Sequence, residues 1–337
     1  MTDNKIVTVE LGHDGPQVGV QGLGCMGMSE FYGNTDETAA RETLETALSV
    51  GVTLFDTADI YGSGANETFL APFVGAHRDE ITLATKFAIE RTDDPQYRGV
   101  RNDPGYIRQA VEDSLRRLGT DVIDLYYMHR RDPAVPLAES VGAMAELVQQ
   151  GKVKQLGLSE VTGAELREAY AVHPIAALQS EWSLFSRDVE RSAVPAAVEL
   201  GVTFVPYSPL GRGFLTGAFA DAGKDLSKED FRQYQPRFTG DNAKTNAALL
   251  EPVHKIAAAH GASAAQVALA WVQQRAQVHG LTVVPIPGTR KSSRLLENVG
   301  ATRLTLTPEE LAVLEPIAGL VAGDRYPDMS STSAARE

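Results

Sequence analysis

The sequence has 337 residues, of which 43% are hydrophobic and 22% charged, enough for a large globular core. Its net charge of −13 argues against a nucleic-acid partner, because no block of basic residues offsets it. Met1–Glu10 has no apolar signal-peptide core, and no run reaches the roughly 18 apolar residues of a membrane span. Cys25 is the only cysteine, which excludes an internal disulfide and a cysteine-based metal cluster. We therefore expect a cytoplasmic protein without membrane contact.

Short β-branched apolar runs alternate with longer amphipathic segments along the chain. The predicted strands are Gly19–Leu23, Val52–Asp56, Ile81–Lys86, Val122–His129, Val153–Leu158, Ala176–Gln179, Val202–Tyr207 and Thr282–Ile286. The predicted helices are Thr35–Val50, Pro104–Leu118, Leu137–Gln150, Ala164–Val172, Glu190–Leu200, Ala243–Ala259, Ser263–Arg275 and Arg294–Val299. This order predicts an α/β fold with a parallel sheet covered on both faces. An open doubly wound sheet and a closed (β/α)₈ TIM barrel both fit, and eight units in about 300 residues favour the barrel.

Three segments stand outside this repeat. Ile6–Glu10 and Gln17–Val20 flank a glycine-rich turn and predict a hairpin before the barrel. Gly211–Asn242, after the seventh strand, is a long loop with little periodicity, and loops of that length are usually functional. The small polar residues 330–337 predict a flexible C-terminal tail, which leaves residues 1–329 as a single barrel domain.

A glycine motif, Gly22–Gly27, imitates the dinucleotide fingerprint of an open α/β sheet. In that fingerprint the helix begins at the glycines, so that its N–H groups meet the pyrophosphate. Here Met28–Gly33 intervenes, and the first suitable N-cap is Thr35 or Asp36. We therefore predict a tight turn at the mouth of a barrel.

Three predicted strands end in an ionisable residue, at the edge where parallel barrels carry their chemistry. Asp56 ends the second strand, Lys86 the third and His129 the fourth. Because consecutive strands are neighbours, we expect these side chains to line one arc of the rim, within reach of Tyr61 in the following loop. Charges also collect at strand ends because water begins there, so each residue alone has a structural alternative.

Together these side chains suit the reduction of a carbonyl group. Hydride addition leaves an alkoxide, which needs a proton donor or a positive charge at its oxygen. The phenol of Tyr61, with an ordinary pKa of about 10, is a weak acid, and a Lys86 ammonium beside it would lower that pKa. Asp56 would keep Lys86 charged and oriented, and His129 would donate a hydrogen bond to the substrate oxygen or join the proton relay.

With these motifs the chain resembles the aldo-keto reductase superfamily, from about residue 20 to about residue 300. Phe55–Gly62, Ala84–Lys86 and Asp124–His129 are similar to the family segments that hold its catalytic Asp, Tyr, Lys and His. The resemblance implies a closed barrel and reduction of aldehydes or ketones by hydride from C4 of NADPH, with no metal. A homo-oligomer is compatible with the sequence.

Further segments resemble the family's cofactor positions. The resemblance implies that Ser159 and Gln179 bind the nicotinamide carboxamide and that Tyr207 stacks on the ring. Glu160 stands where many members have Asn; it could accept from the carboxamide, and the alternative is an acid at the N-terminus of the next helix. The other implied cofactor contacts are Gly24, Met26, Asp56, Ser208, Pro209, Leu210, Gly211, Arg212, Gly288, Thr289, Arg290, Arg294, Glu297 and Asn298.

Backbone, hydroxyl and guanidinium donors in Thr289–Arg294 make a phosphate site. The resemblance implies that this site holds the 2′-phosphate of NADPH. The alternative is that Thr289 or Ser292 only caps the helix and the arginines are solvated. Arg212 and Arg237, in the long loop, are candidates for clamping the other phosphates.

The resemblance places a largely apolar substrate site above the nicotinamide. Its expected walls, each of which could instead be core, are Met28, Phe31, Tyr32, Phe87, Trp182 and Phe185. Arg130 and Arg131 would favour an acidic substrate, although Asp132 follows at once. Two other functions fit less well: a cofactor-binding regulatory subunit similar to potassium-channel β subunits, and an aldolase or isomerase using Lys86 as a Schiff base. Pairing with Asp56 would keep that lysine protonated and poorly nucleophilic.

Overall fold

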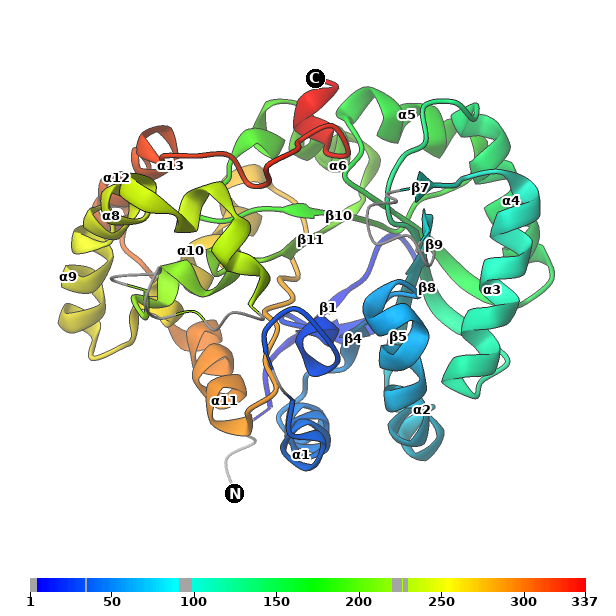
Figure 1. Ribbon diagram of the computed structural model, residues 1–337, viewed down its shortest axis with the longest axis horizontal. Coiled ribbons are helices and arrows are strands. Elements are labelled where there is room, and N and C mark those ends of the chain that lie inside the picture. The colour runs from blue at the N-terminus through cyan, green and yellow to red at the C-terminus, as the bar shows by residue number, and fades with distance from the viewer. Residues whose placement is uncertain (1–4, 34, 91–98, 220–225, 227–229) are drawn as a thin grey trace.

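The computed structural model describes residues 5–33, 35–90, 99–219, 226 and 230–337. The strands are β1 Thr8–Glu10, β2 Gln17–Gly19, β3 Leu23–Gly24, β4 Leu54–Asp56, β5 Thr82–Phe87, β6 Ile89–Glu90, β7 Gly99–Val100, β8 Ile123–Met128, β9 Val153–Ser159, β10 Ala177–Glu181 and β11 Thr203–Tyr207. Seven of them, β3, β4, β5, β8, β9, β10 and β11, form one parallel sheet in that order (Figure 1). Residues 282–288 close the circle through parallel bridges from Val283 to Phe204 and from Gly288 to Gly24. The predicted barrel is confirmed.

Helices surround this barrel (Figure 1). They are α1 Glu37–Ser49, α2 Ala65–His77, α3 Pro104–Leu118, α4 Leu137–Gln149, α5 Gly163–Val172, α6 Ala193–Leu200, α8 Gly240–Ala248, α9 Glu251–His260, α10 Ala264–His279, α11 Ser292–Gly300, α12 Pro308–Leu314 and α13 Ile317–Leu320. Gly119 and Gly201 end α3 and α6 in the left-handed conformation, which glycine adopts without a steric penalty. Within the described residues, no helix is both long and apolar enough to cross a membrane.

Two apolar layers stabilise the barrel. The larger lies between strands and helices, and the smaller fills the barrel with side chains such as Leu54, Ala84, Leu125 and Val205. The predicted hairpin, β1–β2, closes one end of the barrel, because Leu11 and Val18 belong to the inner layer. Gly12 N also donates to Thr203 Oγ1 at the start of β11, at 2.8 Å. At the opposite end, the carboxyl ends of the strands are followed by loops that form the mouth of the barrel.

Two helical segments differ from the prediction. Helix α2 was not predicted, because Pro72 lies inside it and its residues show little separation of apolar and polar faces. The predicted helix Ala243–Ala259 is two helices, α8 and α9, since Pro252 occupies the first turn of α9 and has no N–H to continue the α8 ladder. Within the predicted long loop, residues 220–225 and 227–229 lie outside the described ranges.

The glycine motif forms a turn at the barrel mouth, as predicted. A short 3₁₀ helix, Met26–Met28, follows β3, and α1 begins only at Glu37. Asp36 caps that helix by accepting from Ala39 N at 3.2 Å. A Cβ on Gly24 would lie 3.0 Å from Ile286 O, so the strand needs glycine for its close approach to the eighth segment.

Candidate functional site

Asp56, Lys86 and Tyr61 meet at the carboxyl ends of β4 and β5. Lys86 Nζ donates to Asp56 Oδ1 at 2.5 Å, to Thr57 O at 2.7 Å and to the Tyr61 hydroxyl at 3.4 Å. The Lys86 side chain is fully buried, so these groups replace water around its charge. The ammonium therefore links the carboxylate to the phenol.

Burial dominates the acidity of Tyr61. Removal from water raises the pKa of the phenol above its ordinary value, although the Lys86 ammonium opposes the shift. Our expectation of a lowered pKa is therefore wrong, because desolvation outweighs the nearby cation. Burial also disfavours the Lys86 ammonium, but Asp56 and Tyr61 overcome it and raise the pKa of Lys86. At neutral pH the pair is thus a protonated phenol beside a charged amine.

His129 lies beside Tyr61 at the end of β8. The two ring centroids are 5.9 Å apart with the rings nearly perpendicular. Burial, with the charges of Arg130 and Lys86, holds the pKa of His129 well below its ordinary value. His129 Nδ1 is buried without a hydrogen-bond partner among the described residues. The imidazole is therefore neutral and has unused hydrogen-bonding capacity next to the phenol.

Gln179 extends this network into the barrel. Its Nε2 donates to Asp56 Oδ2 at 2.8 Å, so that both carboxylate oxygens of Asp56 have buried partners. Tyr127 fills the adjacent space, where a Cβ on Gly157 would come within 2.4 Å of the ring. The sequence analysis predicted neither the contact of Gln179 with Asp56 nor the packing of Tyr127 against Gly157. The glycine opposite Tyr127 on the next strand is a sequence signal for that close packing.

A buried ion pair holds the loop that carries Tyr61. Glu67, in the first turn of α2, is fully buried and accepts from Arg117 Nε at 2.6 Å and from Thr85 Oγ1 at 2.6 Å. Because Thr85 precedes Lys86 in β5, the helix after Tyr61 is tied to the strand that carries Lys86.

The residues predicted to hold the 2′-phosphate lie at the N-terminus of α11. Lys291 occupies the N-cap without a side-chain hydrogen bond to the helix, so neither Thr289 nor Ser292 caps it. Ser292 Oγ instead accepts from Thr46 Oγ1 at 3.2 Å. Arg294 is exposed and its guanidinium forms no hydrogen bond with any described residue. The first N–H groups of α11 and this guanidinium are therefore available to an anion.

The other predicted contacts of the adenosine phosphate lie on or just before α11. Arg290 donates to Gly27 O at 3.1 Å and to Tyr32 O at 2.8 Å, so it holds the first turn of the barrel. Glu297 and Asn298 lie on α11, half-buried and buried respectively.

The turn after β11 has the backbone of an anion site but a paired side chain. Ser208, Gly211 and Arg212 have positive φ angles of 47°, 55° and 58°. Backbone in this conformation can point successive N–H groups toward one side, where they bind an anion. The Arg212 guanidinium donates to the Tyr326 hydroxyl at 2.5 Å and lies 3.8 Å from Glu181. A diphosphate would have to share or displace this contact with the C-terminal segment.

The carboxylate of Glu160 faces the C-terminal part of the chain. It accepts from the Tyr207 hydroxyl at 2.7 Å, from Arg325 at 2.9 and 3.2 Å, and from Ser333 N at 3.1 Å. Burial opposes its charged form, but the guanidinium groups of Arg325 and Arg130 lower the pKa of Glu160 to about 2. These contacts give Glu160 a structural role that the sequence did not predict.

The C-terminal segment, residues 330–337, for which we predicted a flexible tail, contacts the barrel through Ser333 and Arg336. Ser333 is 1% exposed, and Arg336 donates to Glu160 O at 2.6 Å and to Glu165 at 3.0 Å. The small polar composition of the segment gives no sign that its partner is a buried carboxylate 173 positions away. The C-terminal segment is therefore part of the wall beside Tyr207.

The variant Glu160→Gln should lower the free energy of unfolding at pH 7 by up to about 3–5 kcal/mol, because Arg325 loses its fully buried partner and keeps only Asp188, at 3.3 Å. The folded-state pKa of Glu160 lies below its ordinary value, so this stabilisation is complete above the ordinary carboxyl pKa. It is lost as the pH falls from about 5 toward about 2. Urea unfolding across this range should show a steeper loss for wild type than for the variant. Equal slopes would contradict the assignment, and the exposed Glu309→Gln is the control.

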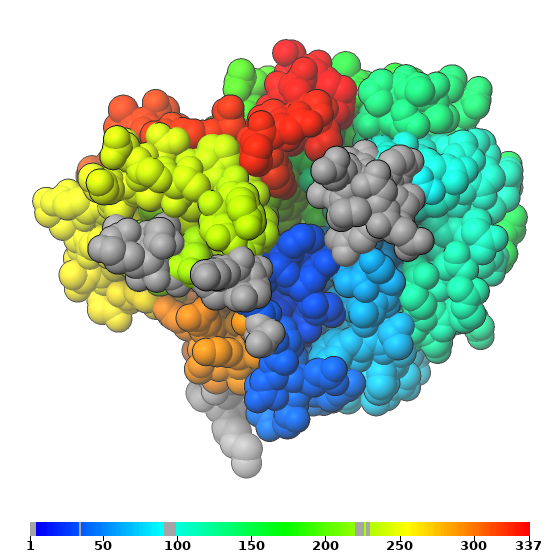
Figure 2. Space-filling model, viewed as in Figure 1, coloured from blue at the N-terminus to red at the C-terminus, as the bar shows by residue number. Residues whose placement is uncertain are grey.

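The apolar walls expected around the substrate are only partly at the rim. Four of the six residues are buried in the larger apolar cluster: Met28, Phe87, Trp182 and Phe185. Trp182, for example, lies fully buried with its ring 4.9 Å from that of Phe204. Phe31 and Tyr32 do lie at the rim, where both rings contact Phe231 of the long segment, at 5.3 and 5.4 Å. Figure 2 shows these segments, blue and yellow-green, adjoining on the visible face.

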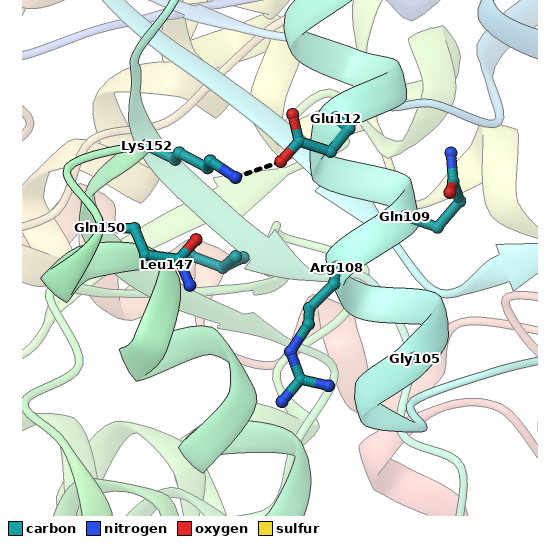
Figure 3. A pocket seen from close by; sticks show the side chains of 7 residues that line it. All are labelled: Gly105, Arg108, Gln109, Glu112, Leu147, Gln150 and Lys152. Atoms are coloured by element: carbon teal, nitrogen blue, oxygen red, sulfur yellow. Dashed lines mark hydrogen bonds and ion pairs between the residues drawn. The ribbon is translucent and has the colours of Figure 1, made fainter.

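A groove between α3 and α4 lies outside the barrel and is not a candidate site (Figure 3). Its cations are already paired: Lys152 with Glu112, as the dashed line marks, and Arg108 with Glu146 at 2.8 Å. Exposed pairs of this kind contribute little energy and offer no free charge to a ligand.

Comparisons with known proteins agree with this geometry. The model of the Aldo/keto reductase family matches residues 22–318. The structure of a glycerol dehydrogenase from Gluconobacter oxydans is 27% identical, with a TM-score of 0.81, and the match covers 97% of this chain and 99% of that one. A holo aldo-keto reductase from Bacillus halodurans is 26% identical, with a TM-score of 0.74 over 96% and 100% of the chains.

A further structure, of an aldo/keto reductase from Klebsiella pneumoniae with NADP and acetate, has a TM-score of 0.70 over 95% of this chain and 98% of that one. At 24% identity it supports the fold alone. The family match covers most of the chain and includes the strand ends that carry Asp56, Lys86 and His129. The chain belongs to the aldo/keto reductase family, whose members are NADP-dependent oxidoreductases.

Proposed function

We propose that this protein reduces aldehydes or ketones to alcohols with NADPH, with Tyr61 as the proton donor. The observation that carries the proposal is the Lys86 ammonium, which contacts both Asp56 and the Tyr61 hydroxyl at the ends of two strands. Carbonyl reduction needs a proton where the alkoxide forms, and a protonated phenol beside a fixed cation supplies it.

Each residue of the group has a role in this proposal. The carbonyl oxygen lies between the Tyr61 hydroxyl and His129, whose neutral ring donates a hydrogen bond. NADPH, when bound, supplies the hydride that reduces the carbonyl carbon and is itself oxidised. Tyr61 passes its proton to the oxygen as the C=O electron pair moves there, and the Lys86 ammonium stabilises the phenolate that remains. Asp56 keeps Lys86 charged throughout.

Two features of the described residues fit NADPH. The N-terminus of α11 has no side-chain cap, and the Arg294 guanidinium stands beside it, as a 2′-phosphate requires. The turn Ser208–Arg212 presents left-handed backbone to the diphosphate. We infer that Ser159, Gln179 and Tyr207 hold the nicotinamide, without the Glu160 side chain, whose oxygens already have protein donors.

Calorimetric titration of NADPH and NADH into the purified protein tests the cofactor assignment. We expect NADPH to bind more tightly, and Arg294→Ala to weaken NADPH binding by about 10- to 100-fold, the worth of a charged hydrogen bond. NADH binding should be nearly unchanged in this variant, because NADH has no 2′-phosphate. Arg303→Ala, at an exposed cation outside the site, is the control. Equal affinity of wild type for both cofactors would contradict the assignment.

A further inference from the structure

The side chain of Arg130 is enclosed at the barrel mouth, directly after His129. It is 9% exposed, and its Nη1 donates to His129 O at 2.7 Å and lies 3.4 Å from Ser159 Oγ. Asn102, which is fully buried, fixes the backbone by donating to Arg130 O at 3.0 Å and accepting from Asp132 N at 2.5 Å. The guanidinium is therefore held between the ends of β8 and β9 and does not swing into solvent.

This guanidinium has no carboxylate partner among the described residues, unlike other buried arginines near the rim. Arg325 pairs with Glu160, and Arg212 and Arg237 both pair with Glu181. An unpaired buried charge is costly, so such a group is usually matched by a ligand or an ion. Arg130 has only neutral oxygens as acceptors in the described part of the chain.

The acidic residues nearest to Arg130 are engaged elsewhere. Glu160 acts on Arg130 electrostatically, but its oxygens accept from Arg325, Tyr207 and Ser333. In the sequence, Asp132 lies close enough to Arg130 to be its ion-pair partner. In the structure, Asp132 Oδ1 instead accepts a hydrogen bond from Ala134 N at 2.9 Å. The adjacent carboxylate therefore does not neutralise the guanidinium.

The place of Arg130 relates it to the reacting carbonyl. It directly follows His129, whose ring centroid lies 5.9 Å from that of Tyr61, and its charge also acts on Tyr61 and Tyr207. A planar guanidinium with free N–H groups matches a carboxylate in a two-bond geometry. We propose that Arg130 binds a carboxylate carried by the substrate, so that this enzyme prefers oxo acids to neutral aldehydes and ketones. The inference rests on the proposed function.

Another role for Arg130 is to position Ser159 for the nicotinamide carboxamide through the 3.4 Å contact. That role predicts weaker NADPH binding and an equal loss for all substrates when Arg130 is changed. Carboxylate recognition predicts a loss confined to acidic substrates, with NADPH affinity retained. The two roles therefore separate in one set of measurements.

The test compares kcat/KM for acid and ester pairs: 4-oxobutanoate with its methyl ester, and 4-carboxybenzaldehyde with methyl 4-formylbenzoate. NADPH oxidation is followed at saturating NADPH. Wild type should favour the acid of at least one pair by about 10- to 100-fold, the factor expected for a charged hydrogen bond. Arg130→Gln should abolish this preference while changing the ester by less than about threefold. Arg130→Lys, which keeps the charge but not the fork, should retain part of it.

Arg116→Gln is the control, because Arg116 lies on α3, is exposed and pairs with Asp113 at 2.6 Å. It should leave both substrates of each pair unchanged. Equal kcat/KM for acid and ester in wild type would overturn the inference without any variant. An equal loss for both in Arg130→Gln, with a raised Kd for NADPH, would assign Arg130 to the cofactor instead. Failure of wild type to reduce any of the four compounds would count against the proposed function itself.

Discussion

Replacing Tyr61 with Phe should lower kcat by about 10²–10⁴-fold, the usual contribution of a positioned general acid. The substitution removes the hydroxyl 3.4 Å from Lys86 Nζ and keeps the ring that packs against His129. The raised pKa of Tyr61 means that the wild-type phenol carries its proton at neutral pH. We therefore expect the loss to appear in the chemical step and not in binding.

Steady-state reduction of a neutral aromatic aldehyde measures this loss, and calorimetry with NADPH provides the control. The Kd for NADPH should change by less than about threefold, because the phenol lies on the substrate side of the site. A Tyr61→Phe enzyme with more than a tenth of the wild-type kcat would remove Tyr61 from the proton-donor role. His129 would then be the remaining donor at the rim.

Replacing Lys86 with Met should damage both turnover and the fold. The ammonium is the buried partner of Asp56, and breaking such a pair costs about 3–5 kcal/mol of unfolding free energy. Loss of the charge that stabilises the phenolate should also lower kcat by about 10²–10³-fold. Urea unfolding followed by circular dichroism, beside steady-state kinetics, measures the two effects.

The double variant Asp56→Asn, Lys86→Met separates these effects. It removes both charges, so it should recover part of the stability that the single Lys86→Met variant loses. It should not recover turnover, because the phenolate still lacks its cation. A double variant with restored activity would show that the low kcat of Lys86→Met came from misfolding.

The barrel could be predicted because its signals are local and repeated. Each strand is a short apolar run, and glycines such as Gly119 and Gly201 mark the helix ends directly in the sequence. The same reasoning placed Asp56, Lys86 and His129 on one arc, since parallel neighbours bring their carboxyl ends together. Helix α2 was not predicted, because it contains Pro72 and its apolar residues do not recur with a clear helical period.

Long-range polar pairing could not be predicted in the same way. The ion pair of Glu160 with Arg325 joins residues 165 positions apart, and no periodicity records such a contact. The burial of aromatic side chains could not be predicted either: Trp182 and Phe185 were expected to line the substrate site, but both are buried in the larger apolar cluster. Burial also reversed the expected pKa shift of Tyr61. The sequence indicates the nearby charge of Lys86 but not how far the phenol is removed from water.

Hydride transfer from labelled cofactor tests the central claim most directly. The purified protein is incubated with benzaldehyde and with NADPH that carries deuterium at both C4 positions, and the alcohol is analysed by mass spectrometry. We predict one deuterium on the carbinol carbon with wild type, and label transfer at least about 100-fold slower with Tyr61→Phe. Unlabelled alcohol, or no alcohol from any aldehyde tested, would contradict the assignment of this chain as an NADPH-dependent carbonyl reductase.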